Sequence, residues 1–132
     1  MAGGTIVQSV FFRAKPGDVF SALMDSAKHS EFTNSKCSIG KKAGDGFSAY
    51  DGYATGKNIE IVQNKKIVQS WRASDWPEGV FSEVKFILKS GKGGTLLSFS
   101  QEGMPEGVSG EIAKGWKDFY WQPLAEYLKK KR

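Results

Sequence analysis

Cysteine and histidine are nearly absent from this chain, which has one of each in 132 residues. The single cysteine, Cys37, excludes an internal disulfide and any zinc site built on cysteines. The single histidine, His29, excludes sites that need several imidazoles, and we interpret it as a surface residue of a short helix. We therefore expect no metal, no cofactor and, because nothing here requires an oxidising compartment, a cytoplasmic protein.

Long apolar runs are also missing. No uninterrupted apolar segment approaches the ~20 residues of a membrane span, so we expect no membrane span. The N-terminal stretch MAGGTIVQSV has no basic segment leading into an apolar one, and we expect no signal peptide. The 16 glycines show no phosphate-binding pattern ahead of a helix, which argues against a nucleotide site.

The net charge of +5 is concentrated at one end of the chain. Residues 129–132 supply four of the five positive charges, which leaves the rest nearly neutral. A nucleic-acid partner would need a basic stripe on the folded body, so none is expected. We interpret the basic tail as solvated and favourable at the negative end of a helix.

The apolar content predicts one folded domain over residues 1–132, with 39% hydrophobic and 13% aromatic residues. β-Branched and aromatic residues predict a first strand over 5–13. Helical spacing of apolar residues then predicts a helix over 14–25 and a short second helix over 26–34. Beyond Cys37, turn-forming residues separate five expected strands, and Asn64 and residues 90–94 mark tight hairpins. These strands are 46–52, 53–62, 66–73, 80–89 and 95–103.

Alternation in the last two strands assigns their faces. The residues expected on the apolar side are Ser82, Val84, Phe86 and Leu88 in one strand, and Thr95, Leu97, Phe99 and Gln101 in the next. Hairpin-linked strands form antiparallel sheets, and the apolar face must be covered. Only the final helix is long enough to do so. The sequence therefore predicts an α+β fold, in which one curved antiparallel sheet wraps around a long C-terminal helix with two short helices after the first strand.

The final helix is crowded with aromatic residues, four of them within positions 116–121. At ~100° per residue, Trp116, Phe119 and Tyr120 should face the sheet. Trp121 lies roughly 140° from Trp116 by the same arithmetic, so we expect it at the rim or facing solvent, where it forms a partner surface with Leu128. Two prolines add to the prediction: Pro105 should lie near the helix start, and Pro123 should bend the helix about one turn upstream.

Five segments in order carry a family resemblance: AKPGDVFSALMD, AYDGYATGKNIEIVQNKKIVQSWR, DWPEG, GGTLLSFSQEGMPEG and GWKDFYWQPLAEYL. Together they resemble the activator of Hsp90 ATPase family, of its carboxy-terminal domain type, within the Bet v 1/START-like superfamily. The resemblance implies the helix-grip fold, with a cavity between sheet and long helix. It also implies that families of this fold bind lipids, sterols, polyketides or plant hormones, that some are cyclases or dehydratases, and that one branch stimulates the Hsp90 ATPase.

Three functional hypotheses follow. The first is a domain that binds a hydrophobic small molecule, since a ligand cavity needs apolar walls and a few inward polar groups; its expected lining is Trp71, Phe86, Phe99, Gln101, Trp116, Phe119 and Tyr120. The second is a module that contacts an Hsp90-type chaperone through its surface. The third is an enzyme using Tyr50, Asp51 or Gln101, although no carboxylate pair stands out and we name no catalytic residue. A core filled by side chains would argue against the first.

Overall fold

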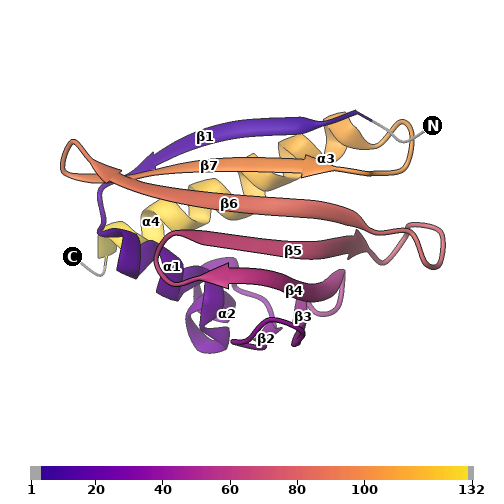
Figure 1. The fold of residues 1–132 in the computed structure, drawn as a ribbon, viewed down its shortest axis with the longest axis horizontal. Coiled ribbons are helices and arrows are strands. Elements are labelled where there is room, and N and C mark those ends of the chain that lie inside the picture. Colours follow the sequence, from indigo (N-terminus) through magenta and orange to yellow (C-terminus); the bar gives the residue numbers. More distant parts are fainter. Residues whose placement is uncertain (1–3, 131–132) are drawn as a thin grey trace.

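A computed structural model gives the fold and describes residues 4–130 (Figure 1). Seven strands form one antiparallel sheet in the order β1-β7-β6-β5-β4-β3-β2. The strands are β1 (Ile6–Phe12), β2 (Ser38–Ile39), β3 (Gly46–Ala49), β4 (Ala54–Val62), β5 (Lys66–Ala73), β6 (Ser82–Gly91) and β7 (Gly94–Glu102). The helices are α1 (Pro16–Met24), α2 (Ser26–Thr33), α3 (Ser109–Trp116), the π-helical turn η1 (Lys117–Trp121) and α4 (Gln122–Lys130).

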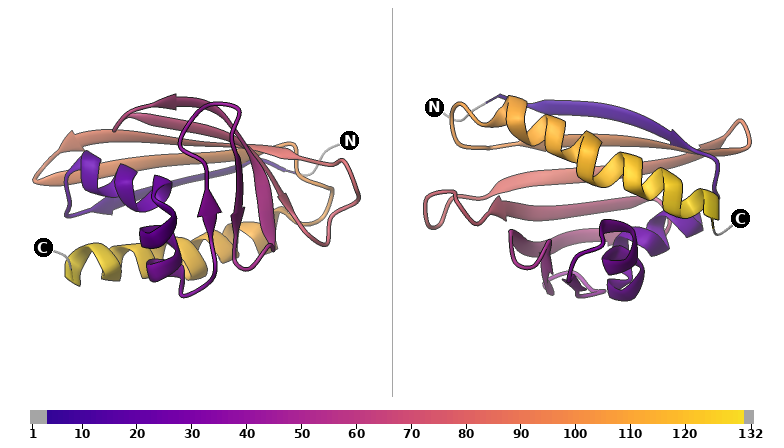
Figure 2. Two further views of the ribbon diagram at one scale, coloured as in Figure 1. Left: turned by 90° about the horizontal axis from the view of Figure 1, so that it is seen from below. Right: turned by 180° about the vertical axis from the view of Figure 1, so that it is seen from behind.

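The long helix formed by α3, η1 and α4 crosses the concave face of the sheet diagonally (Figure 2). The sheet curves over this helix, and α1 and α2 pack near its α4 end. A sheet with one apolar face is stable only when a second layer covers that face. The structure is therefore the predicted α+β helix-grip arrangement, with two short helices after the first strand.

The predicted hairpins are confirmed. Asn64, at the turn between β4 and β5, has a φ angle of 63°. In the turn between β6 and β7, the φ angles are 53° at Lys92 and 80° at Gly93. Two consecutive positive φ values are the signature of a type I′ turn, whose twist matches that of the flanking strands. Here Gly91 lies opposite Gly94, so the loop has two residues.

The predicted faces of β6 and β7 are also confirmed. The side chains at alternate positions are buried: Ser82, Val84, Phe86, Leu88, Thr95, Leu97, Phe99 and Gln101. They form the floor on which the long helix rests, together with Ile67 and Trp71 of β5. The hydrophobic core thus lies between one face of the sheet and one side of the helix.

Three details differ from the sequence-based expectation. The last helix begins at Ser109 rather than near Pro105, because Gly107 has φ of 86° and cannot be part of a right-handed helix. The two-residue strand β2 is too short to show any period, and it was missed. In the basic tail, Lys129 and Lys130 are exposed at the end of α4, while residues 131–132 lie outside the described part of the chain. Among residues 4–130, no helix is long and apolar enough to cross a membrane.

Candidate functional site

The π-helical turn η1 reverses two predictions about the final helix. Phe119, expected to face the sheet, is 61% exposed, whereas Trp121, expected at the rim, is only 4% exposed. A π turn closes hydrogen bonds over five residues rather than four, so it inserts an extra residue and rotates everything after it. The prediction assumed ~100° per residue throughout. Leu128, beyond η1, is buried for the same reason, so neither Trp121 nor Leu128 offers the exposed partner surface that the sequence suggested.

A proline explains why the helix is irregular here. Pro123 has no N–H, so it cannot donate to the carbonyl of Phe119, four residues earlier. Tyr50 supplies the missing donor, because its hydroxyl donates to that carbonyl. Tyr50 lies in a left-handed turn with φ of 52°, and its partial burial raises the pKa of its hydroxyl. The sequence predicted a bend one turn upstream of Pro123, and the structure has the π turn η1 there, secured by a residue from the far end of β3.

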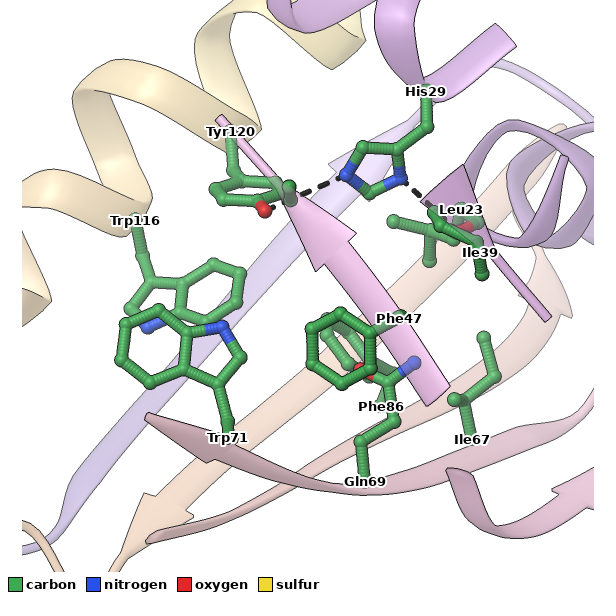
Figure 3. Close-up of a pocket in the computed structure, with 11 residues that line it drawn as sticks. Leu23, His29, Ile39, Phe47, Ile67, Gln69, Trp71, Phe86, Trp116 and Tyr120 are labelled. Atoms are coloured by element: carbon green, nitrogen blue, oxygen red, sulfur yellow. Dashed lines mark hydrogen bonds between the residues drawn. The ribbon is translucent and has the colours of Figure 1, made fainter. Parts of the chain in front are cut away.

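The interior between sheet and helix is almost completely filled. The ring of Trp116 lies 4.4 Å from that of Phe99, measured between centroids, and is stacked at 21° on that of Trp121. What remains is a cavity of about 20 Å³ (Figure 3), enough for about one water molecule. Its lining includes Leu23, His29, Phe47, Ile67, Gln69, Trp71, Phe86, Trp116 and Tyr120.

His29 closes one end of this cavity, and its prediction as a surface residue is wrong. It is buried, with Nδ1 3.1 Å from the carbonyl oxygen of Leu23 and Nε2 3.4 Å from the hydroxyl of Tyr120 (Figure 3). Burial lowers its pKa to about 4, so the ring is neutral at pH 7. A carbonyl only accepts, so Nδ1–H donates to Leu23 and Nε2 accepts from Tyr120. The missed signal was that His29, Phe32 and Thr33 share one face of α2.

Gln101 is buried as predicted, and both ends of its amide have partners inside the protein. Its Oε1 accepts from Trp116 Nε1 at 2.7 Å, and its Nε2 donates to Ser82 Oγ at 2.9 Å. The Ser82 hydroxyl in turn donates to the carbonyl of Trp71 at 2.8 Å. This chain ties β5, β6, β7 and the helix together, so the amide needs no ligand to satisfy it.

An open groove of about 370 Å³ borders the filled core, between the segment after β3 and the α3–η1 part of the helix. Its walls are mostly apolar, and Glu111 is the one charged side chain that the described residues contribute to them. The lining is Tyr50, Tyr53, Ala54, Trp71, Glu111, Ile112, Gly115, Trp116, Phe119 and Tyr120. Four residues predicted to bind a ligand therefore line it: Trp71, Trp116, Phe119 and Tyr120. Phe86 lines only the small cavity, and Phe99 and Gln101 line neither space.

Trp71 lies between the groove and the cavity, and its ring lies 5.7 Å from that of Trp116. Its buried Nε1 donor has no hydrogen-bond partner among the described residues. An unsatisfied buried donor costs ~1–3 kcal/mol. A ligand atom that accepted a hydrogen bond from this N–H would remove that cost.

Tyr50 and Asp51, two of the side chains considered for catalysis, make hydrogen bonds within the protein, and the single cysteine is buried. Tyr50 is occupied by the Phe119 carbonyl, and Asp51 accepts from the main-chain N–H of Lys36 at 2.9 Å. Cys37 is buried, 3.4 Å from the hydroxyl of Thr33. Within the part of the chain that the structure describes, no three His, Cys, Asp or Glu side chains lie close enough to hold a metal ion.

Two solved structures have folds similar to that of this chain. An Hsp90 activator from Plasmodium falciparum has a TM-score of 0.91 at 24% identity, with 96% of this chain and 97% of that chain covered. A protein from Mesorhizobium loti has a TM-score of 0.83 at 20% identity, with 98% and 99% covered. At these identities the likeness establishes the fold alone.

Relatives in sequence are longer proteins. An activator of 90 kDa heat shock protein ATPase homolog from Dictyostelium discoideum is 33% identical over 107 residues, which cover 80% of this chain and 28% of the relative. The human homolog 1 is 24% identical over 115 residues, covering 87% and 34%. This chain thus spans about a third of the length of the relatives it matches. The family described as activator of Hsp90 ATPase homolog 1-like protein matches residues 13–129, and the chain belongs to that family.

Proposed function

We propose that this chain is a module that binds an Hsp90-type ATPase by surface contact and stimulates its ATP turnover. The observation that carries the proposal is the filled interior, whose cavity of about 20 Å³ leaves no room for a lipid-sized cargo. Small-molecule sites in proteins typically enclose ~300–1,000 Å³. Family membership supports the same conclusion, since the Dictyostelium and human relatives are named as activators of this chaperone's ATPase.

The groove and its rim are the surface that we assign to the partner. Phe119 and Tyr53 stand exposed on either side of an apolar floor. Exposed aromatic residues beside a pocket are typical anchors of protein interfaces. An ordinary α-helix would have turned Phe119 toward the sheet, so the π turn and the Tyr50 hydrogen bond hold this ring outside at the cost of helical regularity. A partner's apolar side chain would fill the groove, and a cation beside it would pair with Glu111.

The test is the ATP turnover of a purified Hsp90-type chaperone with and without this chain. We expect stimulation by the unaltered chain and a loss of about tenfold in apparent affinity for Phe119→Ala, the typical cost of an interface anchor. Ile59→Ala is the matched control, because Ile59 is an exposed apolar residue on β4 away from the groove lining. No stimulation by the unaltered chain, or equal losses in both variants, would contradict the proposal.

A second candidate function is the binding of a small apolar molecule in the same groove. Its volume of about 370 Å³ is in the range of small-ligand sites, and the unpartnered Nε1 of Trp71 offers one donor beside it. Native mass spectrometry of protein purified from its source would reveal a co-purified apolar molecule. A bound molecule that Tyr53→Ala releases, and Ile59→Ala does not, would favour this function. Protein that carries no small molecule would count against it.

A further inference from the structure

The free edge of β1 lacks the features that usually keep a sheet edge from pairing. β1 is a terminal strand of the sheet, and no strand among the described residues pairs with its outer side. Its sequence, IVQSVFF, contains no charge, proline or glycine, and its seven residues pair with β7 without a break in register. Natural edges are normally protected by charges, prolines, bulges or shortness. The opposite edge, β2, is protected in this way because it has only two residues.

The register identifies the backbone groups that this edge presents. Gly91 and Gly94 flank a two-residue hairpin and therefore form a hydrogen-bonded pair between β6 and β7. Bonding direction alternates along a strand, so Thr95 and every second residue of β7 point their N–H and C=O groups toward β1. Their partners in β1 are Ile6, Gln8, Val10 and Phe12. The residues between them direct their N–H and C=O groups to the free edge: Val7, Ser9 and Phe11.

A groove runs along this edge and has room for another chain. It has about 540 Å³ and is bounded by Gln8, Ser9 and Val10 on one side and by Lys117, Trp121, Gln122 and Ala125 of the helix on the other. A strand added to a sheet lies ~4.8 Å from its neighbour, and this groove directly borders β1 at Gln8, Ser9 and Val10. Figure 1 shows the long helix crossing behind β1 and the rest of the sheet.

Hydrogen bonds hold the two walls of the groove in place. Gln8 donates through Nε2 to the carbonyl of Ala113 at 3.0 Å and accepts at Oε1 from Trp121 Nε1 at 2.7 Å. This clamp fixes β1 to the helix at two points, one before the π turn and one at its last residue. The site is therefore preformed, and an incoming strand would not have to open it.

The surroundings define the chemistry of the occupant. On the outer face of the sheet, Val7 is 76% exposed and Phe11 lies opposite the exposed Leu96 of β7. On the inner face, Trp121 and Ala125 give the groove an apolar wall. Lys117 is exposed at the rim and forms no ion pair with any residue in the described range. An extended segment with apolar residues on both faces and one acidic residue near Lys117 fits these features.

We propose that the free edge of β1 binds an extended acidic peptide segment, which adds a strand to the sheet in the groove between β1 and the helix. The inference goes beyond the proposed function, since it does not depend on the identity of the chaperone. A second copy of this chain is the alternative occupant, but its β1 segment IVQSVFF has no acidic residue to place near Lys117. Charge complementarity with Lys117 therefore favours the acidic segment.

The probe is a blocked synthetic peptide, acetyl-TVTVEVT-amide, and its controls are the same peptide N-methylated at alternate residues. One control peptide is methylated at the odd residues and a second at the even residues, so that one of the two lacks the N–H groups that would face β1 while its side chains are unchanged. We expect the unmodified peptide to slow amide hydrogen exchange at Val7, Ser9 and Phe11 by at least tenfold, with little change at Gln8 and Val10, which already bond to β7. Equal binding of all three peptides, or no protection at Val7, Ser9 and Phe11 with millimolar peptide, would overturn the proposal.

Variants of the protein give an independent test. Ser9→Pro removes one outward N–H, which an edge strand tolerates, and should abolish peptide binding, whereas Ser9→Ala should retain it. Lys117→Glu should weaken binding several-fold, and Lys65→Glu, in the distant β4–β5 turn, should not. Thermal unfolding verifies that each variant folds. If Val7, Ser9 and Phe11 are instead protected without peptide as protein concentration rises, with a dimer in sedimentation, the occupant is a second copy and the peptide proposal is wrong.

Discussion

The hydroxyl of Tyr50 donates to the main-chain carbonyl of Phe119, which lies 69 residues further along the chain. The bond joins the end of β3 to the π turn of the long helix. It compensates for Pro123, which has no N–H to donate to that carbonyl. Because this bond holds η1 in place, it also helps to decide which aromatic residues face the core and which line the open groove.

The first prediction concerns this bond. Tyr50→Phe should lower the free energy of unfolding by ~1–3 kcal/mol, because it removes a donor to the Phe119 carbonyl that Pro123 cannot replace. In a Pro123→Ala background, residue 123 regains an N–H, and the same substitution should cost clearly less. Chemical denaturation of the four proteins in this cycle measures the coupling. Equal costs in both backgrounds would show that the proline is not the reason for the Tyr50 contact.

The second prediction separates the core from the groove along the same helix. Phe99→Ala or Trp116→Ala should each cost ~3–5 kcal/mol, since both rings are buried against each other. Phe119→Ala should cost less than ~1 kcal/mol, because that ring is mostly exposed. Losses of similar size at Trp116 and Phe119 would mean that the π turn does not rotate the helix as described.

The third prediction is a pH dependence that comes from His29. Its pKa falls from 6.5 in the unfolded chain to about 4 in the folded protein, owing to burial. Between these two values the unfolded state binds the extra proton, so stability decreases as the pH falls from about 6.5 to 4. The loss should approach roughly 3 kcal/mol. Urea unfolding at several pH values should show it, and His29→Gln should flatten the slope in this window.

The sequence was informative wherever the structure depends on neighbouring residues. Alternation in β6 and β7 predicted the buried faces, because strand side chains alternate regardless of what covers them. The positions of Asn64 and Gly93 predicted the hairpins, since turn geometry is local. The resemblance to the activator family and the helix-grip fold were likewise correct.

Features that depend on distant residues were missed. Phe119 and Trp121 exchanged roles because a π turn interrupts the helix, and Tyr50, which secures that turn, belongs to another element. The shared face of His29, Phe32 and Thr33 in α2 is a weak signal of burial, and the partner that covers His29, Tyr120, belongs to the last helix. The free donor of Trp71 is a property of three-dimensional packing that no periodicity reports. The sequence therefore predicted the aromatic residues Trp71, Trp116, Phe119 and Tyr120 of the groove lining, but not the way in which they are arranged.

The last prediction tests whether the buried amide of Gln101 is structural. The hydroxyl of Ser82 donates to the carbonyl of Trp71, so toward residue 101 it can only accept. Gln101→Glu preserves the shape of the side chain, but an ionised carboxylate cannot donate to Ser82 and would be buried without compensation. Only the protonated carboxyl can replace the amide, accepting from Trp116 Nε1 and donating to Ser82 Oγ.

Burial should therefore raise the folded-state pKa of the new carboxyl above the ordinary ~4.3 of a glutamic acid. When the pH is below the pKa of this carboxyl in the unfolded chain, the variant should be nearly as stable as the parent. As the pH rises above that pKa, the unfolding free energy of the variant should fall by up to ~1.4 kcal/mol per pH unit, until the pH reaches the folded-state pKa. The difference in unfolding free energy between variant and parent measures this directly, since His29 contributes equally to both. Gln122→Glu, at an exposed position of α4, should show no such trend. A pH-independent difference for Gln101→Glu would mean that the amide does not donate to Ser82, and Gln101 would again be a candidate for contacting a ligand.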